Sequence, residues 1–427
     1  MAPALILAAV LLAGGAALAY VIGATAILSF VAADRTMFLA ALPQRIVAQV
    51  DNFTLMSMPL FILAGEIMNR TGVTRALLRC AMLMFGGLRG GLGHVNVATS
   101  VFFAGISGSA VADAASLSNM LVPQMRKEGY PATYAAAITA ASSIIGPIIP
   151  PSIIMIFYGA LMGTSVAGLF VAGIVPGLLI ALVLMAANAL YARAQGHPRS
   201  SVEAGDRRAV ILEALPALLI PVIIIGGIVF GVVTPTEAAA LAVLCALGVG
   251  RLYGRIEAGD LFEAFKRTAV LSGSIFLLLS AVAAFGYLAG LQQMPTKLAA
   301  WLIGWGFEGL TYLLLLNVVF LVAGMFLEVP VALALLVPLL APTALAMGID
   351  PVHLGIIICL NLTIGMASPP FGSCLIIVST VTGVGYWKLC RAVIPFVLLE
   401  IAVLAVVTYV PALTMTLPRL VGFAGGG

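Results

Sequence analysis

The sequence predicts an all-α polytopic integral membrane protein with two related halves, each containing a re-entrant helical hairpin and a broken helix. The first observation is composition, because 63% of the 427 residues are hydrophobic and only 8% are charged, a balance typical of helical membrane proteins. The second is a pair of proline-rich interruptions inside apolar runs, at residues 143–152 and 363–372. The third is the constant spacing between these interruptions.

The first interruption, SIIGPIIPPS, cannot continue a helix. Pro147, Pro150 and Pro151 lack an N–H group and clash with the preceding turn, so they leave backbone carbonyls without helical partners. Irregular backbone at membrane depth is tolerated only where protein or a water-filled cavity satisfies it. We therefore expect both interruptions to lie inside the protein and away from lipid.

The two interruptions occupy matched positions. Gly146 and Gly365 lie 219 positions apart (365 − 146), and the pairs Pro150 with Pro369 and Pro176 with Pro395 have the same separation. Broken helices at equivalent places in two halves are typical of secondary transporters that contain an internal repeat.

The chain accordingly divides into a first half, a linking helical pair with basic loops and a second half, at 1–208, 209–267 and 268–427. The hairpins are expected at about 104–124 and 323–342, and the broken helices at about 132–160 and 352–380. Near the amino terminus, apolarity continues to Ala33 and no Lys or Arg precedes it, so we expect a retained first span and no cleaved signal peptide. Residues 73–93 fit either a short span or a helix in the interface.

Loop charges indicate that the halves are inverted. Residues 126–127 after the first hairpin are basic, whereas the matching connection at 347–351 has no Lys or Arg. After the broken helices the bias reverses, because 161–168 lacks basic residues and 383–391 contains two. Basic loops stay on the cytoplasmic side, so the two repeats should have opposite topology. The charge therefore reports membrane orientation and gives no indication of nucleic-acid binding.

The first hairpin contains an acidic residue that needs a partner. Asp113 lies one turn beyond Ser109 in a segment rich in Ser and Gly. A carboxylate at this depth costs about 3 kcal/mol unless it is paired or hydrated, which favours a cation-linked role. A buried ion pair with an arginine is the alternative. In the second hairpin, Glu328 is the lone acidic residue, and we expect it where the first copy has Asp113.

Motifs in order along essentially the whole chain resemble those of the large, DctM-like membrane subunit of tripartite ATP-independent periplasmic (TRAP) transporters. They are FTLMSMPLFILAGEIM, FAGISGSAVADA, KEGYP, IGPIIPPS, TPTEAAA, GIDPVHLG and IGMASPPFG. The resemblance implies a bacterial inner-membrane importer that couples Na⁺ to an organic anion and works as an elevator, with scaffold and transport domains. It also implies two partners: a separate small four-helix membrane subunit and a periplasmic substrate-binding protein.

The resemblance places the cation contacts at the hairpin tips and the unwound helices. These positions are Ser107, Gly108, Ser109, Asp113, Gly146 and Ile149 in the first half, and Glu328, Gly365, Ala367 and Pro369 in the second. Glu328 departs from the aspartate common in the family, so an ion, the substrate and a protein partner all stay open as its contact. Na⁺ is the coupling ion, and no other cofactor or metal is expected.

Polar residues near the breaks are candidates for contact with a carboxylate substrate, such as a dicarboxylate or a sugar acid. They are Ser142, Ser143, Ser152, Asn361, Thr363 and Ser373, of which Ser142 and Asn361 differ by the same 219 positions. The competing interpretation of each hydroxyl is a hydrogen bond to a carbonyl of its own helix. The residues do not identify the substrate.

Two alternatives remain at this point. A proton-coupled carrier of the same fold would use Asp113 and Glu328 as proton sites. An intramembrane serine protease would use the GxSG pattern at 105–108 with His94 or His353 as the base, although a four-residue match without an oxyanion device is weak. The chain has no GxxxxGK[ST] loop and is not expected to hydrolyse ATP. We therefore expect a carrier and not an enzyme.

Overall fold

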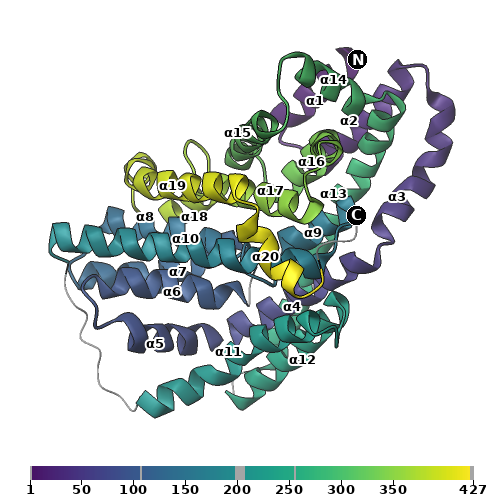
Figure 1. Cartoon of the computed structure of the whole chain (residues 1–427). Coiled ribbons are helices and arrows are strands. Elements are labelled where there is room, and N and C mark those ends of the chain that lie inside the picture. Colours follow the sequence, from purple (N-terminus) through teal and green to yellow (C-terminus); the bar gives the residue numbers. More distant parts are fainter. Residues whose placement is uncertain (1, 106–107, 198–206, 254–255, 424–427) are drawn as a thin grey trace.

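The computed structural model describes residues 2–105, 108–197, 207–253 and 256–423, and all regular elements within these ranges are helical (Figure 1). Among the described residues, six helices are long and apolar enough to cross a membrane, and a bent pair of segments, Thr36–Val50 and Phe53–Arg70, adds a possible seventh. The six are α10 (Val166–Gln195), α11 (Arg207–Val229), α12 (Pro235–Leu252), α13 (Ala258–Leu291), α16 (Val329–Ala346) and α19 (Tyr386–Tyr409). The prediction of an all-α polytopic membrane protein is confirmed.

The amino-terminal apolar stretch forms two helices instead of the single span that we expected. α1 (Ala2–Ala13) and α2 (Leu18–Ala32) are separated at Gly14 and Gly15, and Gly15 adopts a left-handed φ of 74°. A left-handed residue ends a helix, and glycine adopts it without steric cost. α2 then packs against α13, so this stretch belongs to the helical framework.

The helices that follow resolve the uncertainty about residues 73–93. η1 (Thr36–Ala41), α3 (Leu42–Val50), η2 (Phe53–Met56) and α4 (Ser57–Arg70) lead to α5 (Val73–Phe85). At 13 residues, α5 is shorter than the roughly 20 that a membrane span needs. It packs against α11 and α6, and therefore bridges two groups of helices.

Each half contains a hairpin followed by a broken helix. The hairpin arms are α6 (Gly91–Ala104) with α7 (Ala110–Lys127), and α15 (Leu310–Phe326) with α16. The broken helices are α8 (Ala132–Ser142) and η3 (Ser143–Ile145) followed by α9 (Ile153–Met162), and α17 (Pro351–Met366) followed by α18 (Ser373–Thr382). The first arms begin earlier than expected, because the apolar residues before each tip continue the helix.

The 219-residue offset relates whole elements. α7 and α16 begin and end at equivalent positions, since 329 − 110 and 346 − 127 both equal 219. The contacts are reciprocal as well: α7 packs against α18, and α16 packs against α9. Each second hairpin arm therefore lies on the half-helix beyond the break of the other half.

Two groups of helices result. The repeat helices, α6–α10 and α15–α19, surround the two breaks, and the outer helices, α1–α4 and α11–α13, pack mainly with one another (Figure 1). α11 and α12 are joined by a turn that ends in a capping box between Thr234 and Glu237. The remaining helices are α14 (Met294–Gly304), which packs on α16, and α20 (Ala412–Leu420), which packs on α10 and α17.

Candidate functional site

The tip of the first hairpin lies directly on the unwound segment of the first broken helix. Gly108 has a left-handed φ of 57°, and a Cβ added there would lie 2.9 Å from the carbonyl oxygen of Pro151. Ser109 begins α7 as its N-cap, and its hydroxyl accepts a hydrogen bond from the N–H of Ala112 at 3.4 Å. Ser107, also expected at this tip, lies outside the described residues. The hairpin therefore brings polar backbone next to the break.

Asp113 and Gly146, both expected as cation contacts, meet in the structure. Asp113 lies in the first turn of α7 with 1% of its surface exposed. A Cβ added to Gly146 would overlap Oδ2 of Asp113, so the carboxyl group contacts the backbone where α8 unwinds. A carboxylate beside unwound carbonyls provides the oxygen ligands that hard cations prefer.

The donor set suits a monovalent cation better than a transition metal. Within the described ranges, no group of three or more His, Cys, Asp or Glu side chains could hold a metal ion. One carboxylate could neutralise a single positive charge, and backbone oxygens could complete the coordination. No second carboxylate, which would repel the first, is then needed. Ile149 would contribute only its backbone, because its side chain packs against Gly177 of α10.

The second hairpin tip is built differently. Glu328 is the N-cap residue of α16 and is exposed, and its position corresponds to Ser109 (328 − 109 = 219). The residue equivalent to Asp113 is Ala332, which is fully buried. Our expectation that Glu328 stands where the first half has Asp113 is therefore wrong by one helical turn, and the two tips are not equivalent.

The second break is held by close backbone packing. A Cβ added to Gly365 would lie 2.6 Å from Cα of Gly324, so α15 and α17 touch at these two glycines. Ala367 ends α17 and is buried, and Pro369 follows in the unwound segment. In this segment the Ser368 hydroxyl donates to the Ile364 carbonyl at 2.7 Å, and the Pro370 carbonyl accepts from the Tyr386 hydroxyl at 2.7 Å.

The candidate substrate residues point mostly into the protein. Ser142 donates to Oδ1 of Asn96 at 2.8 Å, and its repeat mate Asn361 donates to Oδ1 of Asn317 at 2.7 Å. Both bonds tie a broken helix to the first arm of its own hairpin. Three hydroxyls donate to backbone carbonyl oxygens: Ser143 to Ala140 at 2.7 Å, Ser152 to Pro147 at 2.5 Å and Thr363 to Cys359 at 3.0 Å. Ser373 is partly buried at the start of α18.

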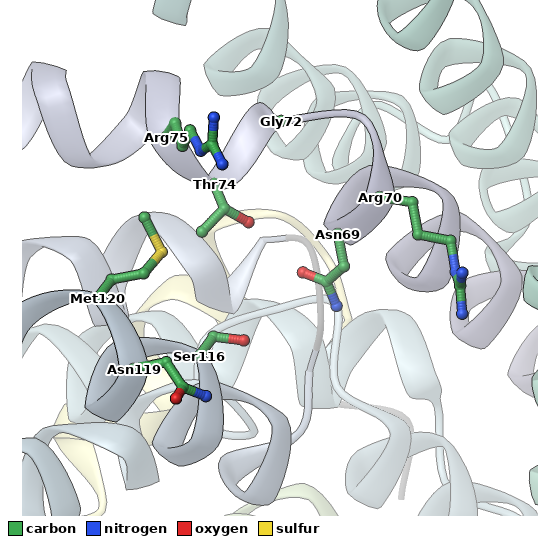
Figure 2. Close-up of a pocket in the computed structure, with 8 residues that line it drawn as sticks. All are labelled: Asn69, Arg70, Gly72, Thr74, Arg75, Ser116, Asn119 and Met120. Carbon is green, nitrogen blue, oxygen red and sulfur yellow. The ribbon is translucent and has the colours of Figure 1, made fainter. Parts of the chain in front are cut away.

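A polar cavity of about 430 Å³ lies elsewhere, between the turn that joins α4 to α5 and the middle of α7 (Figure 2). None of the six candidate substrate residues lines it. Its lining residues are Asn69, Arg70, Gly72, Thr74, Arg75, Ser116, Asn119 and Met120. Sequence reasoning assigned no binding role to the two arginines. The polar pair Ser116 and Asn119, one turn apart on a membrane-depth helix, was the signal that could have drawn attention to this face.

Sequence reasoning also missed Glu400 in α19. Its side chain is 1% exposed, and neither carboxyl oxygen has a hydrogen-bond partner in the part of the chain that the structure describes. The signal was visible as a single acidic residue in the apolar run PFVLLEIAVLAVV. An ionisable group inside a membrane domain is a candidate functional residue by default.

Of the residues proposed for a protease, the structure describes the two histidines but not Ser107. His94 lies in the first turn of α6, about 15 Å along the helix from its end near Gly105. His353 is occupied elsewhere, with Nδ1 2.7 Å from the Thr414 hydroxyl and Nε2 3.3 Å from the Thr408 carbonyl. The described residues therefore give the protease interpretation no support.

Known proteins support a transport function. The sialic acid TRAP transporter large permease protein SiaM of Vibrio cholerae is 40% identical over 90% of this chain and 90% of its own length. The C4-dicarboxylate TRAP transporter large permease protein DctM of Pseudomonas aeruginosa is 35% identical over 88% of each chain. Both are permeases and not enzymes, which confirms the expectation of a carrier.

The fold is shared with a solved structure. The YdaH transporter of Alcanivorax borkumensis, whose topology is described as unusual, aligns with a TM-score of 0.63 over 88% of each chain at 16% identity. The family described as "Tripartite ATP-independent periplasmic transporter, DctM component" matches residues 5–413. The chain therefore belongs to the DctM family, the large permease component of tripartite ATP-independent periplasmic transporters.

Proposed function

We propose that this permease couples the inward movement of Na⁺ to the import of an organic carboxylate, which a periplasmic binding protein delivers. The observation that carries the proposal is the contact between the buried Asp113 carboxyl and the unwound backbone at Gly146. A bound cation there would offset the cost of burying the carboxylate. The two relatives described above are named for sialic acid and C4-dicarboxylates, and both of these substrates are carboxylates.

The family provides the coarse setting for this proposal. Its members are integral proteins of the bacterial inner membrane, and they act with a periplasmic binding protein and a small membrane subunit. The finer mechanism that we propose is an elevator in which the repeat helices move as a unit against the outer helices. The reciprocal packing of α7 on α18 and of α16 on α9 supports it, because it binds the two halves into one body. We further propose that the two repeats have opposite orientations in the membrane.

Coupling follows from electrostatics. A cation at Asp113 and a carboxylate nearby each reduce the cost of burying the other, so their binding free energies are linked. Either species alone would leave uncompensated charge in the membrane interior, which disfavours movement of a half-loaded carrier. This linkage would make uptake depend on both the cation gradient and the carboxylate gradient.

Proton coupling is the second candidate, and Glu400 favours it. A buried carboxyl group without a hydrogen-bond partner among the described residues could carry a proton across the membrane in its neutral form. Such a carrier would have the same fold and the same partners. The ion dependence of uptake separates the two candidates.

We expect uptake to depend on Na⁺ at fixed pH. The permease, the small subunit and the binding protein would be reconstituted in liposomes, and external Na⁺ would be replaced by K⁺ or choline while the membrane potential is clamped. Initial uptake of a carboxylate that the binding protein retains should fall at least about tenfold, since coupling free energies of 1–3 kcal/mol correspond to roughly 5–150-fold. An initial uptake rate that is independent of Na⁺ but depends on a pH gradient would instead establish the proton-coupled carrier.

A further inference from the structure

The polar cavity beside α7 has the composition of an anion site. Its volume of about 430 Å³ is within the range of pockets for small ligands. Six of its eight lining residues are polar or cationic, and none is acidic. Figure 2 shows Thr74 and Arg75 on one wall, with Ser116, Asn119 and Met120 on the facing wall. The cavity can therefore offer a positive charge and several hydrogen-bond donors at once.

The two arginines at the cavity differ in their ion pairs. Arg70 lies 3.9 Å from Glu66 and 3.7 Å from Asp260, so its charge is partly matched by the outer helices. Arg75 takes part in none of the five ion pairs between described residues. It is exposed in the first turn of α5. The unmatched charge of the cavity therefore comes from Arg75, whose planar guanidinium group suits bidentate recognition of a carboxylate.

One rigid helix connects this cavity to the candidate cation site. Asp113 lies at the start of α7, and Ser116 follows three residues later, about 4.5 Å further along the axis. Asn119 lies one turn beyond Ser116, with its amide nitrogen 3.1 Å from the Ala115 carbonyl. An anion in the cavity would thus lie within one or two helical turns of the cation.

The position of the cavity also relates it to the direction of transport. The α4–α5 turn and the far end of α7 both carry basic residues, which the positive-inside rule assigns to the cytoplasm. One wall comes from the turn that follows an outer helix and the other from a repeat helix. Movement of α7 relative to α4 and α5 would therefore separate Arg75 from Ser116 and Asn119.

We propose that this cavity is a carboxylate-binding site on the cytoplasmic release path, in which Arg75 provides the charge and Ser116 and Asn119 provide hydrogen bonds. The assignment rests on the proposed function and adds to it a place where the substrate is held after it leaves the cation site. Relative movement of the two walls would release the anion, because the charge and the hydrogen bonds come from different helices.

The test measures the charge preference of the cavity without any need for Na⁺ or substrate transport. Ser116→Cys would be introduced together with Cys245→Ser, since the other four cysteines are buried. The full chain in inside-out vesicles would react with an anionic sulfonatoethyl or a cationic trimethylammonium-ethyl methanethiosulfonate. The anionic-to-cationic rate ratio, normalised to that of a free thiol in solution, should exceed one severalfold.

Arg75→Gln should bring this normalised ratio close to one. Arg79→Gln is the matched control, because Arg79 lies one turn further along α5, pairs with Glu213 at 3.0 Å and does not line the cavity. It should leave the ratio unchanged. Equal ratios in the parent and the Arg75→Gln variant would overturn the assignment of charge to Arg75.

Substrate protection completes the test. N-acetylneuraminate and succinate would be added separately to the Ser116→Cys vesicles, and at least one should slow modification. In the Arg75→Gln variant, the anion concentration that gives half-maximal protection should rise by roughly tenfold or more, as expected for loss of a hydrogen bond to a charged group. Absence of protection by both anions would refute the release site, whereas the Na⁺ dependence of uptake would be judged separately by the liposome experiment.

Discussion

Asp113→Asn is expected to weaken the Na⁺ dependence of uptake strongly while the protein stays folded. Asparagine has nearly the same shape as aspartate, so the buried contact with Gly146 is preserved and only the negative charge is lost. Hydrogen bonds and contacts to charged groups are worth about 1.5–3 kcal/mol, so the half-saturating Na⁺ concentration should rise at least about tenfold. The measurement is initial uptake in liposomes as a function of external Na⁺.

Two controls make this result specific. Asp51→Asn removes an exposed carboxylate at the C-terminal cap of α3 and should leave the Na⁺ dependence unchanged. Thermal unfolding of purified Asp113→Asn should match that of the parent, which would exclude misfolding as the cause. An unchanged Na⁺ dependence in Asp113→Asn would remove this carboxylate from the cation site and leave Glu400 as the stronger candidate for ion coupling.

The helix breaks could be predicted because their cause is local. Pro147, Pro150 and Pro151 cannot continue a helix in any tertiary context, and the same holds for Pro369 and Pro370. The constant offset of 219 between the two sets then aligned whole elements, including α7 with α16. The contact between Asp113 and Gly146 also fits local reasoning, since both residues flank the predicted tip and break.

Side-chain direction could not be predicted in the same way. Ser143 and Thr363 lie in helices that pack closely on all sides, and their hydroxyls turn to carbonyls of their own helix. Whether such a residue faces a cavity depends on which neighbouring helix approaches, and residue type does not determine that. The sequence pattern therefore located the breaks but not the groups that face a substrate.

The cavity beside α7 was missed for a related reason. Nothing local to Arg70 and Arg75 in the sequence pairs them with α7. Only the tertiary packing places the α4–α5 turn beside Ser116 and Asn119. The register of Glu328, by contrast, was available from the sequence, because adding 219 to 113 gives Ala332.

Gly365→Ala is expected to destabilise the protein strongly, since α15 and α17 touch through their backbones. An added Cβ would lie 2.6 Å from Cα of Gly324, where only backbone can yield, and the helices would have to separate. Overpacking of this kind costs about 1–3 kcal/mol or more. Gly286→Ala in α13 is the matched control, because a Cβ there meets nothing within 4 Å and helix propensity favours alanine by about 0.5–1 kcal/mol.

The repeat mate of Gly365 separates packing from ion binding. A Cβ on Gly146 would displace the Asp113 carboxyl group, whereas the same change at Gly365 would displace backbone. Gly146→Ala should therefore act mainly on the half-saturating Na⁺ concentration, and Gly365→Ala mainly on the midpoint of thermal unfolding. If both variants shifted only the unfolding midpoint, the two breaks would serve the same structural role, and the cation site would lose its asymmetric position in the first half.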